Sequence, residues 1–240
     1  MKKTIVIFSG AGLSAESGIP TFRDSGGLWE QHRVEDVASP EGWARNKELV
    51  LNFYGMRFVK QLEGSPNPAH HAIARLQQHH NVVNITQNID TLLERAGCTN
   101  VWHLHGRIDL QKCEYHYSLA FPFETEFECD YRSQITKPIE LGEHCPKCGG
   151  QLRPDIVWFG EPVDMREEEL MKLIKVADIF IGVGTSAQVY PAAGLLPMFR
   201  RTPEKYFIDP HPAYEALEGY EVMKGSASEM MPELVEKILR

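Results

Sequence analysis

Short apolar runs rich in β-branched residues alternate with helical patterns along this 240-residue chain. The runs predict buried parallel strands, and the patterns between or after them predict helices. The predicted strands are residues 4–9, 81–86, 100–105, 178–184 and 205–209, and the predicted helices are residues 68–80, 91–97, 166–177 and 228–240. This alternation predicts an α/β fold with a Rossmann-like, doubly wound parallel sheet. Ligands of such sheets bind at the carboxyl ends of the strands, where this sequence is polar or rich in glycine.

Two stretches break the alternation. Residues 32–65 have helical patterns with no strand among them, whereas residues 107–155 are irregular in pattern and contain four of the five cysteines. We therefore predict a smaller domain that is inserted into the sheet domain. Its predicted parts are a helical module, residues 32–80, and a zinc-binding module, residues 107–155, and the Rossmann-like domain comprises residues 1–31, 81–106 and 156–240.

Composition narrows the classes of function. Lys and Arg total 25 against 33 Asp and Glu, a net charge of −8, which disfavours direct binding of nucleic acid through phosphate contacts. The apolar run near the N-terminus is shorter than a signal peptide requires, and no segment is long and apolar enough to cross a membrane. An odd number of cysteines without an export signal predicts a reducing, cytoplasmic location. The sequence leaves the oligomeric state open, a monomer included.

A glycine-rich loop follows the first predicted strand, in the stretch IFSGAGLSAESGIPTFRDSGG. Gly10, Gly12 and Ala15 occupy the small positions of the dinucleotide-binding pattern G-x-G-x-x-G/A. A helix beginning near Ser14 would offer its free N–H groups to a pyrophosphate. The alternative is a tight strand-to-helix turn that binds no ligand. The second predicted strand does not end in the acidic residue that would hold ribose hydroxyls, which disfavours an ordinary dehydrogenase.

Five motifs follow one another along the chain: GAGLSAESGIPTFR, TQNID, HLHG, VWFGE and GVGTSAQVYPAAGL. With these motifs the sequence resembles the sirtuins, NAD-dependent protein-lysine deacylases, over essentially its whole length. The resemblance implies that NAD is consumed as a co-substrate and that the partners are acylated lysine side chains of proteins. The products would be free lysine, nicotinamide and 2′-O-acyl-ADP-ribose. The long loop after the first strand would then enclose the nicotinamide ribose while its bond to nicotinamide breaks.

The resemblance also assigns residues to the NAD pocket. Phe22 would shield the nicotinamide ribose from water, and Asp90 belongs to a triplet that holds nicotinamide and its ribose, a position from which it could also cap the next helix. Asp209 stands where the family usually has Asn, so it can accept hydrogen bonds from a ribose but cannot donate an amide hydrogen. The residues assigned to cofactor binding are Gly10, Ala11, Gly12, Ala15, Phe22, Arg23, Gln87, Asn88, Asp90, Gly184, Thr185, Ser186, Asp209 and Ala227.

His105 is the predicted catalytic residue, acting as general base. The reaction needs a group with a pKa near neutrality to take a proton from a ribose hydroxyl after the acyl oxygen has attacked C1′. His103 lies two residues earlier, and on a strand both side chains would point to the same face. The family motif, a His directly before Gly, selects His105. Without that motif, a structural role would be the better interpretation of this histidine.

A cysteine pair predicts a structural zinc site. Cys145 and Cys148, in HCPKCGG, have the C-x₂-C spacing of half such a site. The other half in the family is usually a second pair with the same spacing, and here Cys113 has the expected place while His116 stands in that of the fourth cysteine. We predict a Zn²⁺ ion held by Cys113, His116, Cys145 and Cys148. Cys129 is a rival for the fourth ligand, and a further alternative is that the metal is lost and packing holds the region.

Tyr54 and Arg57 lie three residues apart and project from the same face of a predicted helix. On their own they could be a half-buried Tyr beside a solvated Arg. Sirtuins that remove acidic acyl groups carry a Tyr and an Arg with this spacing and a small residue earlier in the chain, which Ala38 matches here. The resemblance therefore implies that Tyr54 and Arg57 bind the distal carboxylate of succinyl- or malonyl-lysine, with acetyl-lysine as a further substrate.

Phe159, Gly160 and Glu161, in VWFGE, resemble the edge segment along which a substrate peptide pairs as an added strand. The alternative is a core strand that ends in a glycine turn. Two rival functions are also compatible with NAD binding. One is a protein mono-ADP-ribosyltransferase, which cleaves the same bond of NAD, and the other is a non-catalytic NAD-binding module.

Overall fold

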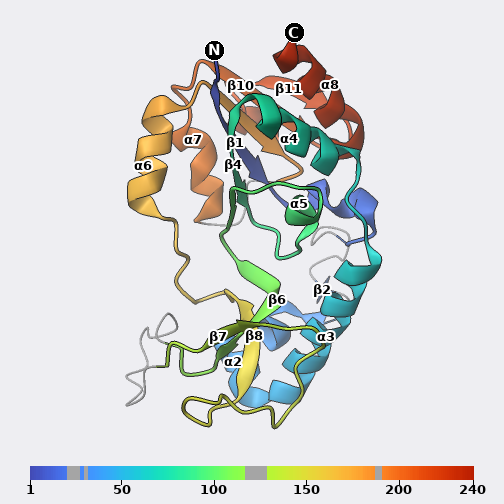
Figure 1. Cartoon of the computed structure of the whole chain (residues 1–240), viewed down its shortest axis with the longest axis vertical. Coiled ribbons are helices and arrows are strands. Elements are labelled where there is room, and N and C mark those ends of the chain that lie inside the picture. Colours follow the sequence, from blue (N-terminus) through green and yellow to red (C-terminus); the bar gives the residue numbers. More distant parts are fainter. Residues whose placement is uncertain (21–27, 30–31, 117–128, 187–190) are drawn as a thin grey trace.

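The computed structural model of the chain describes residues 1–20, 28–29, 32–116, 129–186 and 191–240. Within these residues, six parallel strands form one sheet in the order β11-β10-β9-β1-β4-β5 (Figure 1). The strands are β1 (Thr4–Ser9), β4 (Asn81–Thr86), β5 (Val101–His103), β9 (Ile179–Val183), β10 (Glu204–Asp209) and β11 (Glu221–Lys224). Counted along the sheet, this is the 3-2-1-4-5-6 order of a Rossmann fold, so the predicted parallel α/β fold is confirmed.

Strand β1 shows why the sheet needs helices on both faces. Ile5 and Ile7 pack into one apolar core, whereas Val6 and Phe8 pack into another on the opposite face, as the two-residue period of a strand requires. The first core is closed by α4 (Pro68–His79) and α8 (Ala227–Leu239), and the second by α6 (Glu167–Val176) and α7 (Leu195–Met198). These helices surround the sheet in Figure 1.

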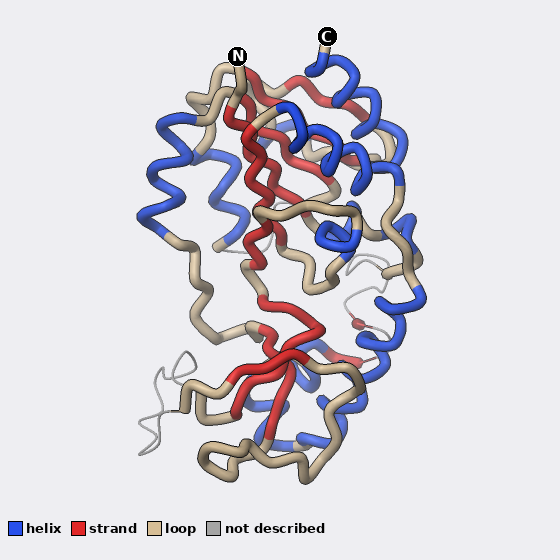
Figure 2. Tube along the Cα trace, in the orientation of Figure 1, coloured by secondary structure: helices blue, strands red, loops and turns tan. Residues whose placement is uncertain are grey.

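A smaller antiparallel sheet lies beyond the main one (Figure 2), in the order β7-β6-β8. Its strands are β6 (Gly106–Cys113), β7 (Arg132–Gln134) and β8 (Leu152–Ile156). It shares a third core with the helices α1 (Val34–Val37), α2 (Pro40–Arg45) and α3 (Lys47–Glu63). The prediction that residues 107–155 are irregular is therefore wrong. The residue bounds of the two domains stay a prediction.

Other differences from the predicted elements are local. The helix expected near Ser14 is replaced by 3-10 turns at Ala11–Leu13 and Ala15–Ser17, because i→i+3 bonds close there and Gly18 then takes φ +83°. A two-residue strand pair, β2 (Leu28–Trp29) with β3 (His32–Arg33), enters the stretch expected to be purely helical. The remaining elements are α5 (Leu92–Arg95) and 3-10 turns at Ala192–Gly194 and Tyr214–Ala216. Among the described residues, no helix is both long and apolar enough to span a membrane.

Glycines bring the loops after β1 and β9 into direct backbone contact. The Gly10 N–H donates to Val183 O at 3.1 Å, and the Gly12 N–H donates to Gly184 O at 2.8 Å. Gly184 has φ +58°, and a Cβ added there would meet Leu13 N and would lie 2.5 Å from Gly12 C. Only glycine fits this contact, because both the backbone conformation and the space exclude a side chain. The contact lies where the strand order reverses, which is the usual ligand crevice of such sheets.

The close contact at Gly184 predicts that one methyl group added at this residue destabilises the fold. We expect Gly184→Ala to lower the free energy of unfolding by about 3 kcal/mol or more, since strained backbone and overpacking each cost about 1–3 kcal/mol. Gly194→Ala is the matched control, because Gly194 has φ −64° and a Cβ there meets nothing within 4 Å. We expect that substitution to be neutral or slightly stabilising. Guanidinium denaturation of both variants measures the difference, and equal stabilities would contradict it.

Candidate active site

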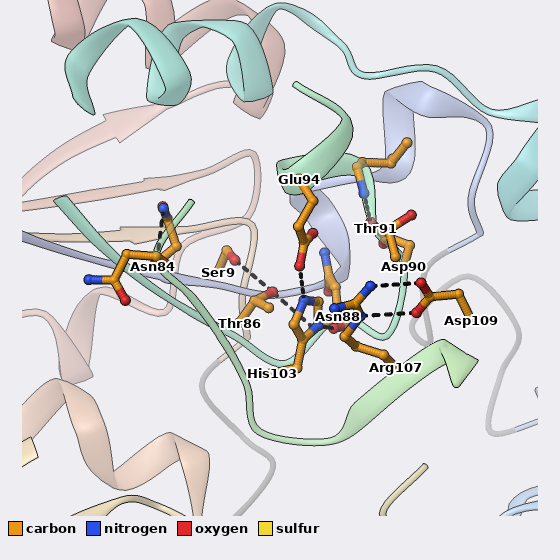
Figure 3. Close-up of polar contacts among 12 residues, drawn as sticks. Ser9, Asn84, Thr86, Asn88, Asp90, Thr91, Glu94, His103, Arg107 and Asp109 are labelled. Atoms are coloured by element: carbon orange, nitrogen blue, oxygen red, sulfur yellow. Dashed lines mark hydrogen bonds and ion pairs between the residues drawn. The ribbon is translucent and has the colours of Figure 1, made fainter. Parts of the chain in front are cut away.

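Polar side chains from three loops meet at the carboxyl ends of β1, β4 and β9. Figure 3 shows the part of this cluster around Asn88 and His103. Gln87 Nε2 donates to Thr185 Oγ1 at 2.8 Å, which joins the loops after β4 and β9. Asn88 Nδ2 donates to Ser14 Oγ at 3.1 Å, which joins the loops after β4 and β1. Beneath them, Thr86 Oγ1 accepts the backbone N–H of Asn88 at 3.0 Å. The predicted residues Gln87, Asn88 and Thr185 therefore lie in one network.

Ser14 is a member of this network that the sequence prediction missed as a site residue. Its side chain is buried and accepts the amide hydrogen of Asn88, and it also hydrogen-bonds the Asp90 carboxylate. A hydroxyl in the middle of the glycine loop, in GAGLSAES, was the signal available. Serine suits the position because one hydroxyl can accept and donate at once.

Asp90 is buried behind this network. Its Oδ1 accepts the backbone N–H of Leu92 at 3.0 Å, and burial raises the pKa of its carboxyl group. The N-cap residue of α5 is Thr91, which makes no side-chain cap bond. Asp90 therefore lies one residue before the N-cap position that the sequence suggested for it. Gly97, with φ +101°, follows the end of this helix.

The two histidines of HLHG contact consecutive backbone carbonyls. His103 Nδ1 lies 2.8 Å from Asn88 O, and His105 Nδ1 lies 3.0 Å from Gln87 O. His103 Nε2 also lies 2.7 Å from Glu94 Oε1. Both ring nitrogens of His103 thus contact acceptors of the protein, which indicates a structural role for this side chain.

His105 has the protonation that a base needs. Burial lowers its pKa, and this effect outweighs the opposing hydrogen bond to Gln87 O. The imidazole is therefore neutral at neutral pH. Since Gln87 O can only accept, the ring proton resides on Nδ1, and the lone pair of Nε2 is left to take a proton.

The other residues predicted to bind the cofactor lie around this cluster. Gly10, Ala11, Gly12 and Ala15 are in the 3-10 loop after β1, and Gly184 and Ser186 follow β9. Asp209 ends β10, where its Oδ1 accepts the His211 N–H at 2.8 Å, and Ala227 begins α8. Phe22 and Arg23 lie outside the described residues.

Tyr54 and Arg57 lie on α3, in the core of the smaller domain. Tyr54 is buried, and its hydroxyl oxygen accepts the indole N–H of Trp158 at 3.1 Å. Burial raises the pKa of Tyr54, so the phenol keeps its hydrogen, which that bond does not use. The guanidinium carbon of Arg57 lies 5.4 Å from the centre of the Phe53 ring. Ala38 is also buried in this core.

The segment after β8 runs between His105 and Ala38. Val157 N donates to His105 O and Phe159 N donates to Ala38 O, both at 3.0 Å. The Phe159 side chain is 50% exposed, and Gly160 has φ +90°. The Glu161 side chain turns inward, where it pairs with Arg153 at 2.7 Å and accepts the Trp158 N–H at 2.8 Å. Its carboxylate therefore holds this segment in shape.

The sulfur atoms of Cys113, Cys129, Cys145 and Cys148 lie within 4.8 Å of one another. Cys113 Sγ is 3.3 Å from Cys148 Sγ, and Cys129 Sγ is 3.6 Å from Cys145 Sγ. A tetrahedral zinc with bonds of about 2.3 Å has sulfur atoms about 3.8 Å apart, so this set fits a structural Zn²⁺.

Cys129 takes the place that we predicted for His116. The reason is backbone pairing: Cys129 N donates to Tyr115 O at 2.9 Å, and a β-bridge aligns Cys129 with His116. The chain thus returns beside His116 and delivers a sulfur to the cluster. Spacing along the sequence gave no sign of this, because the ligand pair is Cys113 and Cys129 and its two members are far apart in the chain.

Comparisons of the chain with a family model, with curated proteins and with solved structures all identify the same family. The model of the Sir2 family matches residues 10–191. An NAD-dependent protein deacylase of Bacteroides thetaiotaomicron is 42% identical over 238 residues, which cover 99% of this chain and 98% of that protein. One from Escherichia coli (strain K12) is 42% identical over 100% of this chain and 83% of its own. The solved structure of a Sir2 homologue in complex with NAD is 36% identical with a TM-score of 0.84, and covers 99% of this chain and 90% of that one.

The cysteine cluster predicts the metal content of two variants. We expect His116→Ala to retain about one zinc per chain after purification without added metal, and Cys129→Ser to lose most of it, because only the second removes a thiolate ligand. Metal analysis by plasma mass spectrometry measures this. Chelation should also lower the melting temperature of the parent and of His116→Ala. Zinc loss in His116→Ala with full zinc in Cys129→Ser would restore the original assignment.

Proposed function

Because this chain belongs to the Sir2 family of NAD-dependent protein deacylases, we propose that it removes succinyl and malonyl groups from protein lysine residues and also accepts acetyl-lysine. NAD is the co-substrate, and the products are the free lysine, nicotinamide and 2′-O-acyl-ADP-ribose. The observation that carries the proposed chemistry is the hydrogen bond from His105 Nδ1 to Gln87 O, which leaves Nε2 as a proton acceptor.

The proposed role of His105 is to take a proton from a ribose hydroxyl once the acyl oxygen has displaced nicotinamide. A neutral imidazole in a buried cleft suits this step, because a base must be unprotonated at the working pH. Gln87, Asn88 and Asp90 supply amide and carboxylate groups on the same side of the cleft, and these can bind a carboxamide and ribose hydroxyls. The backbone N–H groups and hydroxyls after β9 suit phosphate or ribose contacts.

The proposed acyl specificity rests on Tyr54 and Arg57. The hydroxyl of Tyr54 has its hydrogen to donate, since it accepts the hydrogen of Trp158. Arg57 follows one turn later and lies over the Phe53 ring, which supports its planar group from one side. A hydrogen bond to a charged acyl carboxylate contributes about 1.5–3 kcal/mol, or roughly ten- to a hundredfold in rate or affinity. A short acetyl group makes no such contact and needs none.

Two finer statements accompany this proposal. We propose that the substrate backbone pairs along Phe159, Gly160 and Glu161, where the exposed Phe159 side chain offers an apolar contact. We also propose a cytoplasmic location, which the five free cysteines and a thiolate metal site support. Mass spectrometry of the protein acceptor after reaction with NAD separates deacylation from the mono-ADP-ribosyltransferase alternative.

The role of His105 predicts both a loss of activity and a pH profile. We expect His105→Ala to lower deacylation by at least about a hundredfold in folded protein, since general bases contribute about 10²–10⁴-fold. The pKa of His105 lies below the usual value of 6.5, so its neutral form persists to lower pH. The kcat/KM for an acyl-peptide should therefore begin to fall at a lower pH than the titration of an ordinary imidazole would set. Undiminished deacylation by the alanine variant would refute the role.

The role of Arg57 predicts a change in preference between acyl groups. We expect Arg57→Met to reduce desuccinylation about ten- to a hundredfold and deacetylation by less than about threefold, because only the acidic acyl group needs the guanidinium. Arg75→Met is the matched control, since Arg75 pairs with Glu236 on the surface. Matched acetyl-, malonyl- and succinyl-lysine peptides with NAD give the rates. Equal losses on the acetyl and succinyl peptides would remove the proposed specificity.

A further inference from the structure

His103 lies between two groups that can only accept hydrogen bonds. Its Nδ1 is 2.8 Å from the carbonyl oxygen of Asn88, and its Nε2 is 2.7 Å from Oε1 of Glu94. The imidazole is 7% exposed and the Glu94 side chain 28% exposed, so water screens this ion pair weakly (Figure 3). The pair links helix α5 to the end of strand β5 and, through the ring, to the loop after β4.

The chemistry of the two acceptors fixes the form of the ring. A carbonyl oxygen has no hydrogen to donate, and the Glu94 carboxylate has none while it is ionised. Burial acts to raise the pKa of Glu94, but the hydrogen bond and charge of His103, with a smaller contribution from Arg107, outweigh it and lower the pKa overall. With Glu94 ionised, each ring nitrogen of His103 faces an acceptor, and this geometry assigns a hydrogen to both of them.

The other charged groups around this ring are compatible with a cationic His103. Asp90 lies on the same side, and a charged His103 acts to lower the pKa of that carboxyl group. Arg107 is neutralised by a bidentate contact with Asp109, at 2.9 and 2.7 Å. The negative charge of Glu94 and the dipole of the Asn88 carbonyl thus both face the ring directly.

We propose that Glu94 and His103 form a positioning pair, in which a doubly protonated His103 holds the Asn88 carbonyl and thereby fixes residues 87–88 against His105. This inference rests on the proposed function, because it assigns the pair a role in holding NAD. The two residues touch neither NAD nor the acyl group in this scheme, and they act through Asn88.

The geometry explains why such a pair matters for this reaction. Gln87 O and Asn88 O are consecutive carbonyls, and they bind His105 and His103 respectively. A movement of Asn88 would shift the acceptor that sets the His105 tautomer and also the amide that donates to Ser14. The Glu94–His103 pair therefore controls two other groups, the Gln87 carbonyl and the Asn88 side-chain amide. The two histidines of HLHG have opposite protonation and separate tasks.

Three variants test the pair. Glu94→Ala removes the ring's partner, and we expect the Kd for NAD to rise about tenfold or more and kcat/KM for NAD to fall at least as far, because small displacements of positioning groups can cost up to about a hundredfold. Glu94→Gln is the conservative variant. Its amide hydrogen can donate to an unprotonated Nε2 while Nδ1–H still binds Asn88 O, so we expect it to stay within about threefold of the parent in both measurements.

Glu204→Ala is the matched control for loss of an ion pair. Glu204 binds Lys3 at 2.7 Å at the opposite, amino-terminal end of the sheet, so its removal should change stability without changing NAD affinity. All variants are compared at a temperature where circular dichroism shows them folded. Nitrogen-15 NMR of the histidine rings is a further readout that does not depend on activity. We expect both ring nitrogens of His103 to be protonated in the parent, and one of them to lose its hydrogen in Glu94→Gln.

The outcomes separate this inference from the proposed function. An active parent whose Glu94→Ala variant keeps its NAD affinity and kcat/KM would overturn the inference and leave the function standing. A ring of His103 with a single hydrogen in the parent would overturn it as well, even if Glu94→Ala proved unstable. A parent that binds NAD but does not deacylate would contradict the function, whereas NAD affinities and ring spectra would still decide on the pair.

Discussion

The backbone contact between the loops after β1 and β9 sets the positions of the polar groups in the candidate active site. Gly12 and Gly184 bring the two loops to hydrogen-bonding distance, and a side chain on Gly184 would push them apart. Thr185 follows directly, so its hydroxyl meets Gln87 of the loop after β4, on the other side of β1. A wider separation would break this link and with it the fixed position of the Gln87 carbonyl, which sets the tautomer of His105.

Electrostatics then divides the work between two histidines that the sequence places two residues apart. Burial outweighs the single carbonyl contact and favours the neutral form of His105, whereas both ring nitrogens of His103 lie within hydrogen-bonding distance of an acceptor. In the proposed mechanism, the same residue type would serve once as a base and once as a fixed donor. Where the surroundings of two groups favour different protonation states, each group can hold the one defined state that a reaction needs.

Prediction from the sequence succeeded where burial is apolar and failed where it is polar. Strands β1 and β4 lie at the predicted residues because both are rich in buried β-branched residues. Strand β8 was missed because all of it is buried yet its sequence is LRPDI, in which Arg153 and Asp155 are paired with other charges. His116 was preferred to its rival Cys129 for a related reason: the partnership of Cys129 with Cys113 depends on tertiary pairing and not on a local spacing.

Strand β6 directly connects the sulfur cluster to His105. It begins at Gly106, immediately after His105, and ends at Cys113 in the sulfur cluster. Gly106 has φ +79°, and a Cβ there would meet the backbone oxygen of Asp155 on β8, so the His-Gly motif is a requirement of this strand pairing. A zinc ion held by the four sulfurs would fix the far end of β6 and so stabilise the pairing that orients His105, although the metal site lies at the other end of the strand.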